Sequence, residues 1–237
     1  MVDTIKAYDT VAPVYAEYAL KRKDYIKSVD ALVLTYLKSR ASLMDVGCGD
    51  GHRLHQLLSQ SQIKKALAVE PSHEMAKRCR LNAQVEVIET TIDKLNITDS
   101  FEAITALWNV LGHVPCELRI ASLQKMAACL SADGIIMLDV NNRHNAPAYG
   151  RFKVWGRRFV DFFFFDEMRG DCFYDWQIGQ IKIPSYGHLF IHQEMLSLFS
   201  AADLQVVMCC AINYLNGSTS TCLTEGQLFY VLKKKEI

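Results

Sequence analysis

Features that would place a chain in a special class are missing from these 237 residues. The eight cysteines form no C-x-x-C pair, and Cys209 and Cys210 are adjacent in an apolar run, so neither a zinc framework nor a disulfide scaffold is predicted. No apolar run reaches the ~20 residues that span a bilayer, and no signal peptide is visible. We therefore expect a cytoplasmic protein with no membrane partner.

An excess of either charge is also missing, since 26 Lys and Arg residues balance 26 Asp and Glu residues. A nucleic-acid surface needs a local excess of basic residues, whereas the basic clusters at 21–23, 157–158 and 233–235 are small. This argues against nucleic acid as a partner. No internal repeat or low-complexity linker divides the chain, and half of it is hydrophobic, so residues 1–237 are predicted to form a single domain.

Helix and strand patterns alternate along most of the chain. Helical periodicity covers residues 6–40, with a break near 22–24. The patterns that follow predict strands at 42–46, 66–69, 85–89, 103–108, 134–140, 204–214 and 227–232, and helices at 52–59, 73–81, 118–130 and 191–202. Ser72 is the expected N-cap of the helix at 73. This alternation predicts an α/β fold with a doubly wound, mostly parallel sheet that binds ligands at the carboxyl ends of its strands.

The most informative stretch is residues 43–51, an apolar run followed by glycines at alternate positions. Glycines at 47, 49 and 51 allow the backbone to pass close to a ligand, and the helix that follows directs free N–H groups to the same place. Glu70 ends the next apolar run, at the distance from the glycines where a carboxylate reaches ribose hydroxyls. Together these features predict a nucleoside pocket.

The glycine register indicates which nucleoside is bound. A dinucleotide fingerprint would require glycine at His52, whereas Asp45, Gly47, Gly49 and Gly51 match D-x-G-x-G-x-G without a gap. This pattern resembles motif I of the class I S-adenosylmethionine-dependent methyltransferases. The resemblance implies a Rossmann-like methyltransferase fold with seven strands and an antiparallel last strand. It also implies S-adenosylmethionine as cofactor, bound by Asp45 and the three glycines of the motif, with Glu70 on the ribose, Pro71 also in contact with the cofactor, and Thr91 and Ile92 around the adenine.

A second resemblance covers residues 101–150 and concerns the fourth strand. The sequence of this segment is similar to that of the glycine N-methyltransferases. The resemblance implies that Leu107 and His113 contact the cofactor and that Asn109 faces the acceptor. His113 and Asn109 are thus the candidate catalytic residues, with His113 able to take a proton from the acceptor. The family's substrate-binding arginine would fall at position 141, which is Asn141 in this chain. The arginine here comes two residues later, and Arg143 is therefore the candidate for substrate binding. We therefore expect a small amine or an amino acid other than glycine as acceptor, with a hydroxyl or a carboxylate as the open alternatives.

The N-terminus resembles the Y-D-x-x-A-x-x-Y opening of many small-molecule methyltransferases, with Tyr8 and Tyr15 at its tyrosine positions. The resemblance implies that residues 1–40 form a helical cap over the cofactor, with Tyr15 beside it. Arg22 would pair with the methionine carboxylate, and Tyr18 would contact the substrate. An amphipathic helix that packs its aromatic residues on the sheet would explain the tyrosines equally well.

Residues 148–189 interrupt the alternation and are rich in aromatic side chains. We expect strands at 160–165 and 177–183, in an antiparallel β insertion that covers the carboxyl edge of the sheet as a lid over the substrate pocket. The alternative is an extension whose aromatics pack on each other or on another subunit, because the sequence is compatible with a monomer or a homodimer.

The sequence thus predicts an S-adenosylmethionine-dependent methyltransferase acting on a small molecule. The sulfonium carries an activated methyl group, so the protein must mainly align a nucleophile and exclude water, and no catalytic triad or metal is required. Two alternatives remain open. The protein could methylate tRNA or another RNA, or it could bind the cofactor without catalysis.

Overall fold

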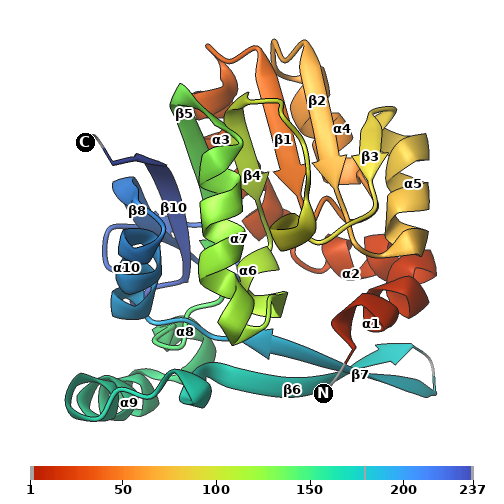
Figure 1. Cartoon of the computed structure of the whole chain (residues 1–237). Helices are drawn as coiled ribbons and strands as arrows, with labels where there is room; N and C mark the ends of the chain where they lie inside the picture. The colour runs from red at the N-terminus through yellow and green to blue at the C-terminus, as the bar shows by residue number, and fades with distance from the viewer. Residues whose placement is uncertain (1–2, 179, 236–237) are drawn as a thin grey trace.

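A computed structural model describes residues 3–178 and 180–235. Its centre is a sheet of eight strands in the order β3-β2-β1-β4-β5-β10-β8-β9 (Figure 1). The parallel strands are β1 (Ser42–Val46), β2 (Lys65–Val69), β3 (Glu86–Ile88), β4 (Phe101–Ala106) and β5 (Leu130–Val140). These apolar runs form central strands because helices cover both faces of a doubly wound sheet.

The sheet closes with β8 (Leu204–Ile212), β9 (Thr219–Ser220) and β10 (Gln227–Lys234). Strand β10 pairs antiparallel with both β5 and β8, while the two-residue β9 extends the outer edge. The predicted seven-stranded, mostly parallel sheet with an antiparallel last strand is therefore confirmed, with β9 as an addition.

Two groups of helices enclose the sheet. Helices α3 (Lys23–Leu37), α4 (His52–Ser59) and α5 (His73–Ala83) pack on one face, and α7 (Cys116–Ala128) and α10 (His192–Ala201) pack on the other. Consecutive residues of a strand point to opposite faces of the sheet. Leu43 packs in the core layer that contains α3, and Met44 packs in the layer that contains α7. Ser72 caps α5 as predicted, accepting a hydrogen bond from the Met75 N–H at 3.2 Å.

Short elements gather at the carboxyl ends of the parallel strands. They are α1 (Thr4–Val11), η1 (Ala12–Val14), α2 (Tyr15–Leu20), η2 (Ile92–Lys94), α6 (Val110–His113) and α8 (Ala146–Tyr149). The predicted N-terminal helical region is broken between α2 and α3, close to the expected position. Within the described part of the chain, no helix combines the length and apolar character needed to cross a membrane.

The insertion differs from the sequence-based prediction. It contains α9 (Arg151–Phe163), η3 (Glu167–Gly170) and a hairpin of β6 (Asp171–Ile178) and β7 (Ile181–His188). The prediction of a strand at 160–165 was wrong, because α9 runs through Phe163, and the predicted strand at 177–183 spans the tip of the hairpin instead. The phenylalanine run suggested a strand by propensity, whereas aromatics spaced three and four residues apart share one side of a helix.

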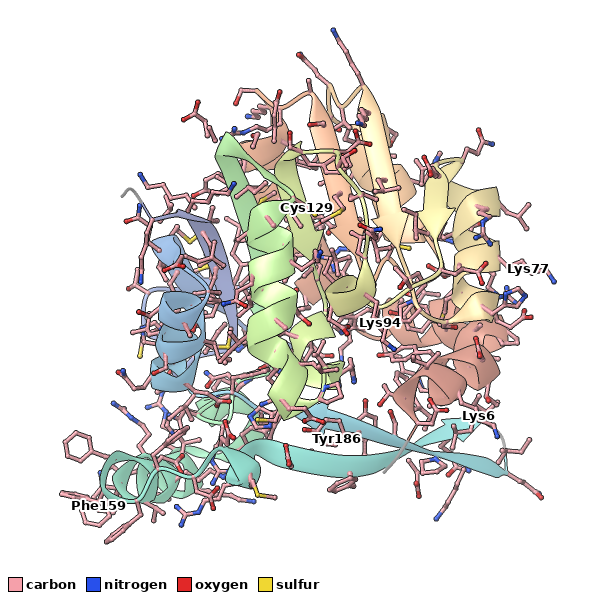
Figure 2. The ribbon with its side chains drawn as sticks, viewed as in Figure 1. Lys6, Lys77, Lys94, Cys129, Phe159 and Tyr186 are labelled. Carbon is pink, nitrogen blue, oxygen red and sulfur yellow. The ribbon has the colours of Figure 1, made fainter. Side chains whose placement is uncertain are left out.

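The two halves of the insertion take different places. The β6–β7 hairpin extends beneath the carboxyl ends of the parallel strands, toward α1, whereas α9 projects to the side of the molecule (Figure 1). The Phe159 side chain points outward from α9, away from the sheet (Figure 2). The hairpin, and not the phenylalanine-rich helix, therefore lies over the edge where the site was expected.

Candidate active site

A cavity of about 460 Å³, here the loop chamber, opens beside the glycine-containing turn after β1. It brings together many of the residues singled out in the sequence: Tyr15, Gly47, Gly49, Glu70, Pro71, Thr91, Ile92, Leu107 and His113. These residues come from the ends of successive strands and from the N-terminal helices. The topology therefore assembles at one sheet edge what lies scattered along the chain.

The three glycines of the turn have different tasks. All have positive φ, but only Gly47 and Gly49 line the loop chamber. A Cβ at Gly51 would lie 2.7 Å from the Cys79 Cα, so this glycine allows the start of α4 to pack against α5. A Cβ at Gly49 would meet nothing closer than the Tyr15 ring at 3.5 Å, so it would project into free space in the chamber.

Glu70 is buried, and its carboxylate is fixed by two backbone groups. The Gly49 N–H donates to Oε2 at 3.0 Å, and the Ser72 N–H donates to Oε1 at 2.9 Å. Burial raises the Glu70 pKa to about 7, although both hydrogen bonds act in the opposite direction. Each oxygen keeps a further lone pair, which suits a carboxylate that accepts hydrogen bonds from a diol.

Asp45 lies behind the loop chamber and does not line it. Its side chain is buried in the sheet, where Oδ1 accepts a hydrogen bond from the Thr105 hydroxyl at 2.7 Å. Burial raises the Asp45 pKa to about 6. Asp45 therefore lies in the sheet just before the glycine-containing turn, and its predicted contact with the cofactor stays a prediction.

At the far side of the loop chamber, Thr91 and Ile92 form part of the wall. The Thr91 hydroxyl is buried and has no hydrogen-bond partner within the protein. A buried polar atom without a partner is costly, and a polar ligand in the chamber would satisfy it. Together with the space above Gly49 and the fixed carboxylate of Glu70, this atom makes the chamber suitable for a nucleoside.

A second cavity of about 260 Å³, the aromatic chamber, adjoins the first. Four residues line both cavities and separate them: Tyr8, Tyr15, Trp108 and His113. The remaining walls come from the strand ends, the hairpin and the segment after β8: Asn109, Asn141, Cys172, Tyr174, Trp176, Gly187, Leu189 and Tyr214. No Asp, Glu, Lys or Arg is among the described residues that line this chamber. Its walls are mainly aromatic rings.

His113 and Tyr8 form a hydrogen-bonded pair between the chambers. The Tyr186 backbone carbonyl can only accept, so His113 Nδ1, 2.8 Å away, must carry a proton. His113 Nε2 is then a free acceptor in the neutral ring, and the Tyr8 hydroxyl donates to it at 3.0 Å. Burial lowers the His113 pKa, which favours this neutral form. The pair can therefore accept a proton that is released beside the Tyr8 hydroxyl.

Asn109 lies at the end of the fourth strand, with the left-handed φ of 62°. Its Oδ1 accepts a hydrogen bond from the Asn141 N–H at 2.8 Å, which fixes the amide against the next strand. A Cβ at Gly112 would lie 2.3 Å from the Asn109 amide nitrogen, so only glycine leaves room for this side chain. Asn109 and His113 thus both line the aromatic chamber, and their roles toward an acceptor stay predictions.

Besides Asp45 and Gly51, three more predicted site residues lie outside both chambers. The Arg22 guanidinium covers the Tyr214 ring, 4.2 Å from its centroid, and the Tyr18 hydroxyl donates to the Gln177 carbonyl at the hairpin tip. Arg143 Nε donates to Asp161 at 2.9 Å, so its charge is used to attach α9. The structure does not bring Arg143 to the acceptor side, because a buried carboxylate elsewhere holds it.

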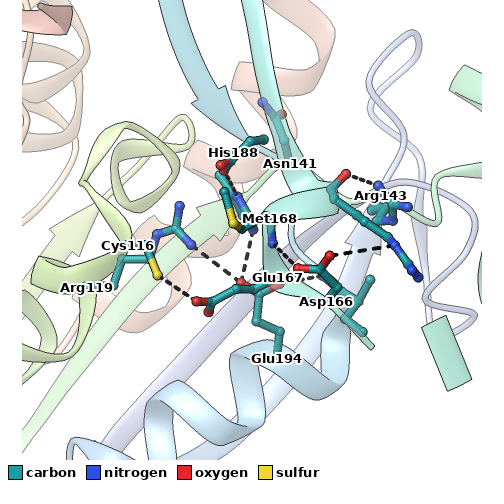
Figure 3. Close-up of polar contacts among 12 residues, drawn as sticks. Cys116, Arg119, Asn141, Arg143, Asp166, Glu167, Met168, His188 and Glu194 are labelled. Carbon is teal, nitrogen blue, oxygen red and sulfur yellow. Dashed lines mark hydrogen bonds and ion pairs between the residues drawn. The ribbon is translucent and has the colours of Figure 1, made fainter. Parts of the chain in front are cut away.

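A buried network attaches the base of the hairpin to the rest of the protein (Figure 3). His188 lies between Asp171 at 2.7 Å and Glu194 of α10 at 3.0 Å. Arg119 of α7, fully buried, lies 3.6 Å from Glu194 and donates to the Tyr186 hydroxyl at 3.1 Å. Since the Tyr186 carbonyl also fixes His113 Nδ1, this network positions the His113 ring as well as the hairpin.

The sequence analysis missed several residues that line the aromatic chamber. Trp108, Trp176 and Tyr214 were not assigned to the site, although Trp108 directly precedes Asn109. The Trp176 Nε1 is buried without a hydrogen-bond partner, whereas the Trp108 Nε1 donates to the Tyr214 hydroxyl at 3.0 Å. The aromatic richness of the insertion hinted at Trp176 alone, and nothing in the sequence links Trp108 with Tyr214, because their meeting depends on how separate elements pack.

Comparison with known proteins agrees with this geometry. Residues 43–134 match the family described as methyltransferase domain, a segment that includes the glycine turn, Glu70 and His113. A curated relative, the dTDP-3-amino-3,6-dideoxy-alpha-D-glucopyranose N,N-dimethyltransferase of Streptomyces fradiae, is 26% identical over 123 residues. That match covers 50% of this chain and 48% of the relative, so the chain spans about half the length of the relative it matches.

Solved structures match over nearly the whole chain. An S-adenosylmethionine-dependent methyltransferase from Clostridium acetobutylicum has a TM-score of 0.66 at 12% identity, covering 97% of this chain and 99% of the other. A possible histamine N-methyltransferase from Thermotoga maritima has a TM-score of 0.68 at 16% identity, covering 99% and 100%. These likenesses show that the chain shares their fold.

Proposed function

We propose that this chain, a class I S-adenosylmethionine-dependent methyltransferase, methylates the nitrogen of a small-molecule amine. The observation that carries the proposal is the aromatic chamber, which adjoins the loop chamber through the Tyr8–His113 pair. The similarity to an amino-sugar N,N-dimethyltransferase supports a small amine as acceptor.

The loop chamber supplies the groups that would hold the cofactor. Glu70 would accept hydrogen bonds from the ribose hydroxyls, the Thr91 hydroxyl and Ile92 would face the adenine, and Gly49 leaves the space that the ligand needs. When bound, S-adenosylmethionine supplies a methyl group on a sulfonium centre with a neutral leaving group. The protein residues then bind and orient the acceptor.

The walls of the aromatic chamber suit a group that becomes positively charged. Transfer forms the N–CH3 bond and breaks the S–CH3 bond, so positive charge moves from sulfur to nitrogen. Aromatic faces stabilise such a cation, and the chamber offers Tyr15, Trp108, Tyr174 and Trp176 among its rings. A chamber without an ionised side chain among its described lining residues also favours entry of the amine as the neutral, nucleophilic base.

The proton released by the methylated amine then has an acceptor. It passes to the Tyr8 hydroxyl while that hydroxyl gives its own proton to His113 Nε2, which leaves the amine neutral and the imidazole cationic. The Asn109 amide, fixed by Asn141, is placed to orient the acceptor beside this pair. We further propose that, within the predicted cap at residues 1–40, helices α1 and α2 cover the site, since they contribute Tyr8 and Tyr15 to the chamber, and that the hairpin part of residues 148–189 acts as a lid, since it supplies Tyr174 and Trp176.

The test is methyl transfer from labelled S-adenosylmethionine to a panel of amino sugars, histamine-like amines, alcohols, carboxylic acids and tRNA. We expect transfer to amines only, with Tyr8→Phe lowering turnover by about 10²-fold. The affinity for S-adenosylhomocysteine should change little, because Tyr8→Phe keeps the ring. Tyr36→Phe is the matched control, as Tyr36 is also partly buried but lines neither chamber. Transfer to tRNA or to oxygen acceptors alone would refute the proposal.

A further inference from the structure

Helix α9 attaches to the protein by one side and presents an aromatic side to solvent. Val154 and Asp161 are buried, whereas Phe152 and Trp155 are 94% and 72% exposed. The exposed rings are in contact: Trp155 stacks on Phe159 at 6.3 Å between centroids, and Phe159 meets Phe163 at 5.0 Å. We call this surface the aromatic ridge; it consists of Phe152, Trp155, Phe159, Phe162 and Phe163.

Basic residues border the ridge on both sides. At about 100° per residue along a helix, Arg151 and Arg158 fall along one border, Lys153 lies farther round on the other side, and Arg157 points away from the ridge. Asp161 is the one acidic residue within α9, and it is buried and paired with Arg143 and His144. The surface around the ridge therefore lacks negative charge from α9 itself.

Some of this positive charge is already engaged. Arg157 donates to the Arg143 carbonyl and lies over the Tyr149 ring, and Arg151 lies 3.9 Å from Glu225. After α9, Asp166 pairs with Arg169, and Glu167 accepts a hydrogen bond from Cys116. Lys153 and Arg158, one on each side of the ridge, thus carry the charge that is available to a partner.

We propose that the aromatic ridge docks on the surface of a bilayer that contains anionic lipids. An exposed apolar strip with Phe and Trp at its centre and Lys and Arg at its borders matches a helix lying in the headgroup plane. The aromatic rings would enter the acyl boundary, while Lys153 and Arg158 would extend to the lipid phosphates. Such docking needs no spanning helix, so it differs from the membrane partner that the sequence argued against.

A second copy of the chain is less suited to cover the ridge. Packing two ridges together would bring the basic borders of both helices side by side, and α9 provides no exposed carboxylate to pair with them. Like charges facing each other disfavour association, whereas an anionic surface complements both borders at once.

Sedimentation of the full chain with vesicles tests the proposal. We expect binding to vesicles of phosphatidylcholine and phosphatidylglycerol in roughly equal parts, and much weaker binding to phosphatidylcholine alone. Replacing both Trp155 and Phe159 with serine should weaken binding about tenfold or more. Replacing Lys153 and Arg158 with glutamate should weaken binding to the anionic vesicles about fivefold or more and leave binding to phosphatidylcholine unchanged.

Leu81→Ser is the matched control, because Leu81 on α5 is 72% exposed, like Trp155, but lies far from α9 (Figure 1). It should bind as the unaltered chain does. Stabilisation by S-adenosylhomocysteine should be the same in all variants, since none of these residues lines either chamber. If the double serine variant does not fold, Phe152→Ser alone provides the same test.

Two results would overturn the proposal. One is the absence of an effect of the ridge: the unaltered chain and the serine variants sediment equally with the vesicles, or the unaltered chain sediments with neither kind of vesicle. The other is a dimer in solution that Trp155→Ser with Phe159→Ser converts to a monomer, which would show that a second copy covers the ridge. Both results would leave the methyltransferase activity untouched, so they are separable from failure of the proposed function.

Discussion

Replacing Glu70 with glutamine should weaken cofactor binding while leaving the fold intact. The carboxylate is held by the Gly49 and Ser72 N–H groups, and the ribose hydroxyls would donate to its remaining lone pairs. A hydrogen bond to a charged group contributes about 1.5–3 kcal/mol, which corresponds to about ten- to a hundredfold in dissociation constant. Glutamine keeps one acceptor oxygen and the side-chain volume, so the lower end of this range is expected.

The raised pKa of Glu70 adds a dependence on pH with a definite sign. With a pKa of about 7, the carboxyl group becomes protonated as the pH falls below 7, and a protonated group loses acceptor capacity for the diol. Cofactor affinity should therefore be highest above pH 8 and should fall through pH 7 to a limit about tenfold lower, which is reached when Glu70 is fully protonated. Glutamine at position 70 does not titrate, so the affinity of that variant should be nearly flat across this range.

The same shift affects stability in the opposite direction. Because the pKa in the folded protein lies above the ordinary value of 4.5, protonated Glu70 is favoured by folding. The contribution of Glu70 to stability is thus present at low pH and is lost as the pH rises from 4.5 to about 7. Without cofactor, Glu70→Gln should reduce this part of the pH dependence of the free energy of unfolding.

Calorimetric titration with S-adenosylhomocysteine at several pH values measures the affinity lost in Glu70→Gln and the dependence of the affinity on pH. Glu89→Gln is the control, because Glu89 follows the neighbouring strand β3 but pairs with His73 and Arg80 and does not line the loop chamber. If Glu70→Gln binds as tightly as the unaltered chain, the assignment of Glu70 to the ribose is refuted. Equal affinity of the unaltered chain at pH 6 and pH 8 would refute a raised pKa of the bound carboxyl group.

Three further predictions follow from the same geometry. Gly49→Val should abolish binding of S-adenosylhomocysteine by calorimetry, because its side chain enters the loop chamber and φ is +57°; normal binding would show that the turn is not the cofactor loop. Arg119→Ala should lower the free energy of unfolding in urea by about 3 kcal/mol, since it leaves Glu194 with one buried cationic partner fewer, and an unchanged midpoint would contradict this. Trp176→Phe should raise KM for the amine and spare cofactor affinity, because the unpartnered N–H is lost with the pyrrole part of the indole while an aromatic ring is kept; an unchanged KM would exclude that N–H from acceptor binding.

Local sequence patterns predicted most of the sheet and the cofactor side of the site. The apolar runs and the alternating glycines are contiguous in the chain, and the strand order places Gly49, Glu70 and Thr91 at one edge by topology alone. The methyltransferase fold and the cofactor were therefore predictable from residues 43–92. What each glycine does was not, because the close approach of Gly51 to α5 depends on helix packing.

The acceptor side was decided by tertiary structure. The sequence predicted a strand at 160–165, where α9 ends, because a phenylalanine-rich run fits either periodicity. Only the attachment of α9 through Val154 and Asp161 fixes which of its sides faces outward. The Tyr8–His113 pair joins residues 105 positions apart, and the Tyr186 carbonyl that sets its tautomer comes from the hairpin. Such contacts depend on how separate elements dock and not on the spacing of residues along the chain. By itself, the sequence determined that this protein has a nucleoside pocket, while the packing of the hairpin against α1 and α6 determined what lies beside it.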